Sequence, residues 1–137
     1  MKNSQEAQFC NDAFYQAFLE RNINAMNNVW AKNTPLLCLH PGGHALTGRQ
    51  DVITSWQNIL SHHTCPRIIH KVDKVVSYEN MVLVTCYEWD ERQPDNLLLA
   101  TNGFSREDGE FKLVFHQAGP TNIGPIERDE KPEQPRH

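Results

Sequence analysis

The chain has 137 residues, of which 39% are hydrophobic and 22% charged, and a formal net charge of −4. This length suits one domain with a single core and excludes two ordinary domains. Lysine and arginine are scattered rather than grouped, and no stretch approaches the length of an apolar membrane span, so we expect no nucleic-acid partner and no membrane contact. The first residues lack an apolar signal-peptide core, which predicts a cytoplasmic location.

The N-terminal part of the chain predicts two helices and a strand. Apolar residues recur every three or four positions over residues 4–21, which is typical of a helix with one buried face. Asn22 is a suitable N-cap for a second helix that extends to Lys32. Pro35 excludes further helix, so residues 36–40 are predicted as a short strand that ends at a Pro-Gly-Gly turn.

The remainder predicts one more helix and a meander of four strands. A helix is expected to begin at Thr47 or Gly48 and to end before His62. Beyond Pro66 the apolar period changes to two, which indicates strands. Short turn-like segments, among them residues 93–96, separate the runs and favour antiparallel pairing. The expected strands are residues 67–78, 81–90, 97–106 and 110–118.

Helices followed by a long antiparallel sheet predict an α+β fold in which the helices cover one sheet face. The other face also needs cover, because residues 81–87 and 97–100 are apolar at both alternating positions. A homodimer through the outer sheet face supplies that cover, and a tightly curled sheet is the alternative. We expect one domain over residues 1–120, followed by a proline- and charge-rich tail, residues 121–137, that forms a surface arm or is disordered.

Several short motifs occur in an order that resembles a known family. They are Ala-Met-x-x-Val-Trp-Ala at residues 25–31, His-Pro-Gly-Gly at 40–43, Gly-Arg at 48–49, Ser-Trp at 55–56, Ala-Thr-Asn-x-Phe at 100–104 and Arg-Glu-Asp-Gly at 106–109. From about residue 5 to about residue 120, the chain is similar to the SnoaL-like proteins of the nuclear transport factor 2-like superfamily. The resemblance implies a cone-shaped, cystatin-like fold, in which a curved antiparallel sheet wraps around N-terminal helices. It also implies a pocket at the open end and dimers through the outer sheet face.

This scaffold serves ketosteroid isomerase-like enzymes, polyketide cyclases, dehydratases and plain association modules, so the function depends on the site residues. Ketosteroid isomerase-like members carry a carboxylate base at the position of His40, and an unperturbed imidazole is also a base near neutral pH. His40 is therefore the candidate catalytic residue, with a pocket wall or a structural hydrogen bond as the alternative. In the ketosteroid isomerases, a tyrosine and a protonated aspartate donate hydrogen bonds to the enolate oxygen. By alignment with that family, the corresponding positions here are Phe14 and residues 99–100, whose side chains have no hydrogen-bond donor. Tyr15 lies about 100° further around the helix and cannot simply substitute.

Six other residues are candidate ligand-binding residues. Asn102 and His116 are polar residues among apolar neighbours on predicted strands, so each needs a hydrogen-bond partner or a ligand. Arg49 follows the turn, where it binds a substrate carboxylate or, alternatively, makes a structural salt bridge. Large aromatic residues supply core area and, in a cone, also form pocket wall. Those expected to line the pocket are Phe14, Trp30 and Trp56.

Neither a metal nor a cofactor is predicted. The seven histidines and four cysteines show no zinc-binding spacing, and no glycine-rich loop is followed by the Gly-Lys-Ser/Thr of a phosphate site. The cysteines are far apart in sequence and are expected to be reduced thiols: Cys10, Cys38, Cys65 and Cys86.

These features predict a small soluble domain that binds a hydrophobic small molecule in an aromatic-lined pocket, with acid–base chemistry of the isomerase, cyclase or dehydratase kind. The alternative is a non-catalytic, dimeric association module that recruits another protein. An enclosed pocket of about 300 Å³ or more at His40 favours ligand chemistry, whereas a filled cone favours association.

Overall fold

The computed structural model describes residues 2–124. Three helices precede or interrupt the strands: α1 (Lys2–Glu20), α2 (Ile23–Val29) and α3 (Arg49–Ser61). The strands are β1 (Leu37–Leu39), β2 (Ala45–Leu46), β3 (Ile68–Ser77), β4 (Val82–Asp90), β5 (Gln93–Glu107) and β6 (Glu110–Pro120). None of these helices is long and apolar enough to cross a membrane. Most of the predicted tail, residues 125–137, lies outside the described residues.

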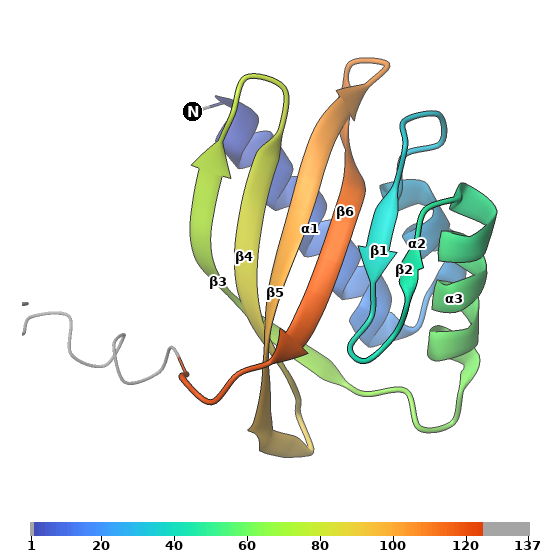
Figure 1. Cartoon of the computed structure of the whole chain (residues 1–137), viewed down its shortest axis with the longest axis vertical. Helices are drawn as coiled ribbons and strands as arrows, with labels where there is room; N and C mark the ends of the chain where they lie inside the picture. The colour runs from blue at the N-terminus through green and yellow to red at the C-terminus, as the bar shows by residue number, and fades with distance from the viewer. Residues whose placement is uncertain (1, 125–137) are drawn as a thin grey trace, which may run out of the picture.

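The strands form one sheet in the order β2-β1-β6-β5-β4-β3, with all neighbours antiparallel except β1 and β6. Shifts in strand register bend the sheet, because an extra residue on one strand increases the local twist. Figure 1 shows α1 crossing behind the long strands, with α3 beside β2 at the edge of the sheet. The predicted α+β fold, a curved antiparallel sheet around N-terminal helices, is confirmed.

The connection between α1 and α2 follows the predicted capping. Asn22 precedes α2, and its side-chain oxygen accepts a hydrogen bond of 3.0 Å from the backbone N–H of Ala25. The helix ends at Val29 rather than at Lys32, so the predicted boundary is wrong. The reason is tertiary: Trp30 is extended and the next N–H, that of Ala31, donates to the carbonyl of Leu113 in β6.

Two details of the sheet differ from the prediction. The short strand β2 was not expected, and it pairs with β1 across the Pro-Gly-Gly turn. Residues 93–96 do not form the turn between the second and third predicted strands, because Gln93 already pairs with Asp90. The chain reverses at Glu91 and Arg92 instead, where the Arg92 backbone N–H donates to the carboxylate of Asp90 at 3.0 Å.

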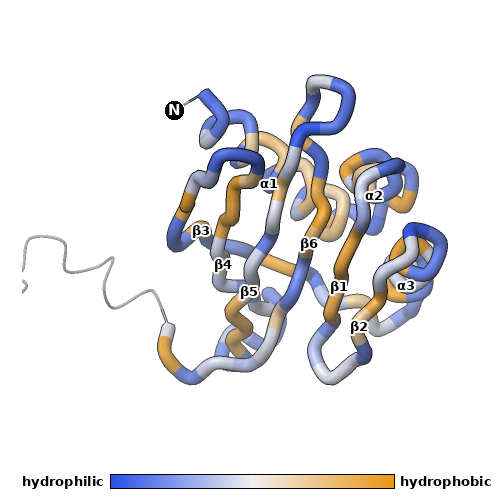
Figure 2. Tube along the Cα trace, turned by 45° about the horizontal axis from the view of Figure 1, so that its top comes forward, coloured by the Kyte–Doolittle hydropathy of each residue, from blue (hydrophilic) through white to orange (hydrophobic). Residues whose placement is uncertain are grey.

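The two faces of the sheet have different environments. The face covered by the helices is buried, and along β4 it alternates through Val82, Val84, Cys86 and Glu88. Hydrophobic stretches occur on the strands as well as on the helices (Figure 2). The opposite, outer face also carries apolar side chains, and Leu99 is 39% exposed there. Other partly exposed apolar residues on that face are Val76, Leu83, Trp89 and Phe115.

Candidate functional site

Four of the predicted site residues meet at the end of the cone where β1 ends. His40 follows β1, and its ring contacts Trp56 of α3 with 4.9 Å between ring centroids. Phe14 of α1 lies 5.3 Å from Trp56 and 5.1 Å from His116 of β6. Parallel pairing of β1 with β6 sets Cys38 opposite His116 and so brings His40 to this end. Phe14, His40, Trp56 and His116 are called the aromatic cluster below.

Hydrogen bonds define which nitrogen of His40 carries the proton. The Ser55 hydroxyl has one proton, which it donates to the Val52 carbonyl at 2.6 Å. Its oxygen therefore accepts the second contact, a 2.9 Å hydrogen bond from Nε2–H of His40. This leaves the lone pair of a neutral imidazole on Nδ1. His40 is half-buried, and burial lowers its pKa below 6.5, so the neutral form predominates at pH 7.

Behind the aromatic cluster, a chain of hydrogen bonds runs through the interior. His116 Nδ1 lies 2.6 Å from Asn102 Oδ1, and Asn102 Nδ2 lies 3.1 Å from the Tyr15 hydroxyl oxygen. That hydroxyl donates to Glu88 Oε2 at 2.5 Å. Asn102 also donates to Asn11 Oδ1 at 2.8 Å. The four residues His116, Asn102, Tyr15 and Glu88, called the polar chain below, are each at most 2% exposed.

Burial sets the charge states at both ends of the polar chain. Loss of hydration raises the pKa of Glu88 from 4.5 to about 7, although the Tyr15 hydroxyl opposes the shift. Burial, followed by the nearby Glu88 charge, raises the pKa of Tyr15 well above its usual value. The pKa of His116 falls to about 3, mainly through burial and secondarily through His40. At neutral pH the chain therefore joins a neutral imidazole to a carboxyl group that is close to its pKa.

The sequence analysis missed Glu88 and Asn11, and it set Tyr15 aside because of its position on the helix. Phe14 contacts Trp56 and His116, whereas the adjacent Tyr15 contacts His70 and Glu88, and both are buried. Tyr15 reaches the Asn102 amide although it does not replace Phe14. The signal for Glu88 was present: it continues an otherwise apolar set of alternating residues on the buried face of β4. An acidic residue in such a position requires a buried partner.

Trp30 and Arg49 lie away from the aromatic cluster. Trp30 directly follows α2, is fully buried and forms a β-bridge to Leu113 of β6. Arg49 donates three hydrogen bonds to backbone carbonyls at the end of α2, those of Asn27, Trp30 and Ala31, at 2.8–3.1 Å. These bonds satisfy acceptors that a helix terminus leaves free, so Arg49 holds α2 against α3.

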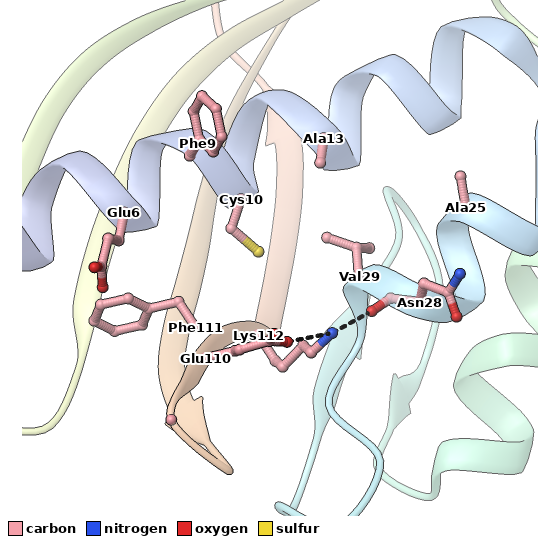
Figure 3. Close-up of a pocket in the computed structure, with 11 residues that line it drawn as sticks. Glu6, Phe9, Cys10, Ala13, Ala25, Asn28, Val29, Glu110, Phe111 and Lys112 are labelled. Atoms are coloured by element: carbon pink, nitrogen blue, oxygen red, sulfur yellow. Dashed lines mark hydrogen bonds and ion pairs between the residues drawn. The ribbon is translucent and has the colours of Figure 1, made fainter.

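A groove of about 530 Å³ lies elsewhere, between α1, α2 and the start of β6 (Figure 3). Its apolar lining includes Phe9, Cys10 and Val29, and none of its lining residues belongs to the aromatic cluster. The Lys112 ammonium at its edge already donates to the Asn28 carbonyl at 2.9 Å. Phe14, Trp56 and His116 are each at most 2% exposed, so a ligand at the aromatic cluster has access only through the half-buried edge of His40.

Candidate metal ligands do not assemble within residues 2–124, where no group of three or more histidine, cysteine, aspartate or glutamate side chains is arranged to hold an ion. The four cysteines are free thiols. Burial raises the pKa of Cys10 and of Cys38 to about 12, so both are protonated at neutral pH and are poor nucleophiles.

Comparisons with known proteins give related folds under several names. A candidate calcium/calmodulin-dependent protein kinase type II association domain from Thiobacillus denitrificans is 30% identical, with a TM-score of 0.70 over 82% of this chain and 92% of that one. A candidate dehydratase of the nuclear transport factor 2-like family from Streptomyces avermitilis is 25% identical, with a TM-score of 0.74 and coverage of 89% and 98%. A ketosteroid isomerase-like protein from Erwinia carotovora atroseptica shares the fold at 14% identity, with a TM-score of 0.68 and coverage of 89% and 97%.

Comparison with curated proteins finds no match. A protein-family comparison does find one: residues 8–121 match the model of the SnoaL-like domain. The match spans most of the chain and contains the whole of the aromatic cluster and of the polar chain. The chain therefore belongs to the SnoaL-like domain family.

Proposed function

We propose that this domain binds a small, largely apolar molecule at the exposed edge of His40 and that His40 acts there as a general base. The observation that carries the proposal is the fixed tautomer of His40. Because Ser55 accepts from Nε2–H, the neutral ring keeps its lone pair on Nδ1, next to the aromatic wall of Trp56. The solved structures described as a dehydratase and as ketosteroid isomerase-like share the fold, which supports acid–base chemistry.

The proposed reaction is a proton transfer within one bound molecule. His40 Nδ1 takes a proton from an acidic C–H next to a carbonyl, and the electron pair of that bond moves toward the carbonyl oxygen. The resulting imidazolium is disfavoured by burial, so it returns the proton to the ligand, at the same or a neighbouring carbon. The indole N–H of Trp56 is buried and directed at the Cys38 sulfur, so the oxyanion that develops on the ligand is solvated at the exposed edge of His40.

Exchange of the α-protons of 2-tetralone, an apolar ketone, into heavy water tests the proposal. We expect the wild-type protein to accelerate exchange above an equal concentration of free imidazole. His40→Gln is expected to reduce the rate to that background while its amide still bonds to Ser55. Exchange that is equally fast in both proteins, or no acceleration by the wild type, would refute His40 as the base.

Mapping of the binding site distinguishes the His40 edge from the groove. In a titration of the isotope-labelled protein with 2-tetralone, we expect the NMR signals of His40, Ser55 and Trp56 to move. Shifts confined to Phe9 and Phe111, which line the groove, would place binding there and contradict the proposal. The groove holds no histidine and its Cys10 thiol is protonated, but the carboxylates of Glu6 and Glu110 line it, so exchange that persists in His40→Gln would point to the groove rather than to His40.

A second candidate function is association, and we propose a homodimer through the outer sheet face. Leu99 and Val76 are 39% and 44% exposed on that face, which is more apolar than a monomer needs. The relative that is 30% identical is described as an association domain. Light scattering at micromolar concentration is expected to give twice the chain mass of 15.8 kDa, and Leu99→Lys is expected to give a monomer. A wild-type monomer would contradict this assembly, and a dimer without proton exchange would leave association as the function.

A further inference from the structure

The feature that the proposed function does not use is the polar chain. We propose that Glu88 is a positioning residue that acts through Tyr15 and Asn102 to select the tautomer of His116 and so to keep a second lone pair, on Nε2, in the aromatic cluster. The tautomer follows from the hydrogen bonds alone. Its consequence for a ligand rests on the proposed function.

The amide of Asn102 has a defined orientation in this chain. Its nitrogen donates to two acceptors, Asn11 Oδ1 and the Tyr15 hydroxyl oxygen, at 2.8 Å and 3.1 Å. Its oxygen therefore faces His116 and accepts from Nδ1–H at 2.6 Å. A neutral imidazole has one N–H, so the lone pair of His116 lies on Nε2.

The direction of the chain is set at its Glu88 end. Tyr15 has a single hydroxyl proton, and Glu88 is the group that takes it. With that proton committed, the Tyr15 oxygen is an acceptor, and Asn102 must present its nitrogen. A carboxylate has no proton to donate, so the reverse direction is closed while Glu88 is ionised. Asn11 alone does not determine the orientation of the Asn102 amide, because the Asn11 nitrogen donates only to a weak acceptor, Cys86 Sγ, at 3.4 Å.

Because the polar chain is buried, water cannot replace or reverse its hydrogen bonds. Each member of the polar chain is at most 2% exposed, so the Tyr15 hydroxyl takes the place of water as a donor to the Glu88 carboxylate. The other titratable groups that face Glu88 are the ring of His70 on β3, which stacks on Tyr15 at 4.1 Å, and the thiol of Cys86. Burial lowers the pKa of His70, and the Cys86 thiol is protonated, so neither supplies a compensating positive charge at neutral pH.

The inference also bears on the chemistry proposed for His40. His116 and His40 have ring centroids 6.3 Å apart, and each is a neutral imidazole with one lone pair. Because His116 is 2% exposed and His40 is half-buried, a ligand contacts only the His40 ring. The neutral His116 ring then adds no positive charge beside the imidazolium that forms on His40 during the proposed proton transfer.

Nitrogen-15 NMR of the histidine rings in the free protein tests the tautomer directly. For the wild type at pH 8 we expect His116 to be protonated on Nδ1 only. Glu88→Gln introduces an amide that can donate to Tyr15, so the chain can run in either direction and the two tautomers become comparably populated. Glu91→Gln, an exposed carboxylate on the neighbouring turn, is the matched control and is expected to leave His116 unchanged.

Tyr15→Phe provides a second variant in case the Glu88 substitution prevents folding. It removes the link to Glu88 without adding a polar group, and it is also expected to yield a mixture of His116 tautomers. Retention of the wild-type tautomer in the folded variants would overturn the inference. Failure of 2-tetralone exchange would refute the proposed function and leave the tautomer result standing, so the two failures are distinguishable.

Discussion

Replacing Glu88 by glutamine should change how the stability of the domain depends on pH. The pKa of this carboxyl is raised in the folded protein, from 4.5 to about 7, by its loss of hydration. Between these two values the unfolded chain releases the proton while the folded chain keeps it. The free energy of unfolding must therefore fall as pH rises through this interval, because deprotonation favours the unfolded state. Glutamine has no such proton, so its variant lacks this decline.

The size of the effect follows from the pKa difference. A shift from 4.5 to about 7 corresponds to about 3 kcal/mol. The substitution can also strengthen or weaken the hydrogen bond to Tyr15, but this changes the free energy of unfolding by an amount that does not depend on pH. We therefore expect the stability of Glu88→Gln relative to the wild type to improve by about 3 kcal/mol between pH 4.5 and pH 8.

Urea unfolding at these two pH values provides the measurement. The fluorescence of Trp30 and Trp56 reports unfolding, since both indoles are buried in the native protein. Glu91→Gln serves as the control and should show no comparable change with pH. A relative stability of Glu88→Gln that stays constant within about 1 kcal/mol would show that Glu88 ionises at its ordinary pKa, and the reasoning about the polar chain's charge would fail.

Three further predictions concern other parts of the site. The pKa of His116 is lowered to about 3, so the contribution of the neutral ring to stability is complete above pH 6.5 and is lost as pH falls toward 3. This loss, about 5 kcal/mol, should appear in acid unfolding followed by circular dichroism. Its absence would mean that the ring is charged in the folded state. Ser55→Ala should cost about 1 kcal/mol of stability and slow 2-tetralone exchange, because His40 then populates both tautomers; an unchanged rate would exclude the positioning role. Arg49→Met should lower the free energy of unfolding by about 2 kcal/mol without a change in the exchange rate per folded molecule, and a selective loss of rate would instead indicate ligand contact.

The order of the elements could be predicted from the sequence because local patterns determine it. The apolar stripe of α1, the N-cap at Asn22 and the change to a period of two after Pro66 each depend on neighbouring residues. The end of α2 could not be predicted in this way. It is set by a hydrogen bond from Ala31 to Leu113, which lies far along the chain.

The same distinction applies to the candidate site. The bulky aromatic members could be proposed from composition and from the resemblance, and the structure brings Phe14, Trp56, His40 and His116 together. The polar chain depends on which strand positions face α1, and that depends on the register of β4 and β5. An isolated glutamate in an apolar strand was the available signal, and only the register shows that Tyr15 is its partner.

The parallel pairing of β1 with β6 also bears on how the protein forms during synthesis. Within the described sheet, β1 and its small partner β2 join the long strands only through β6. His40 therefore cannot take its place until β6, at residues 110–120, has left the ribosome and docked against β5. Contacts between such distant segments form slowly, because the intervening chain must first be closed into a loop. A nascent chain that lacks β6 also lacks His116 and cannot position His40, so the proposed proton transfer requires the complete domain.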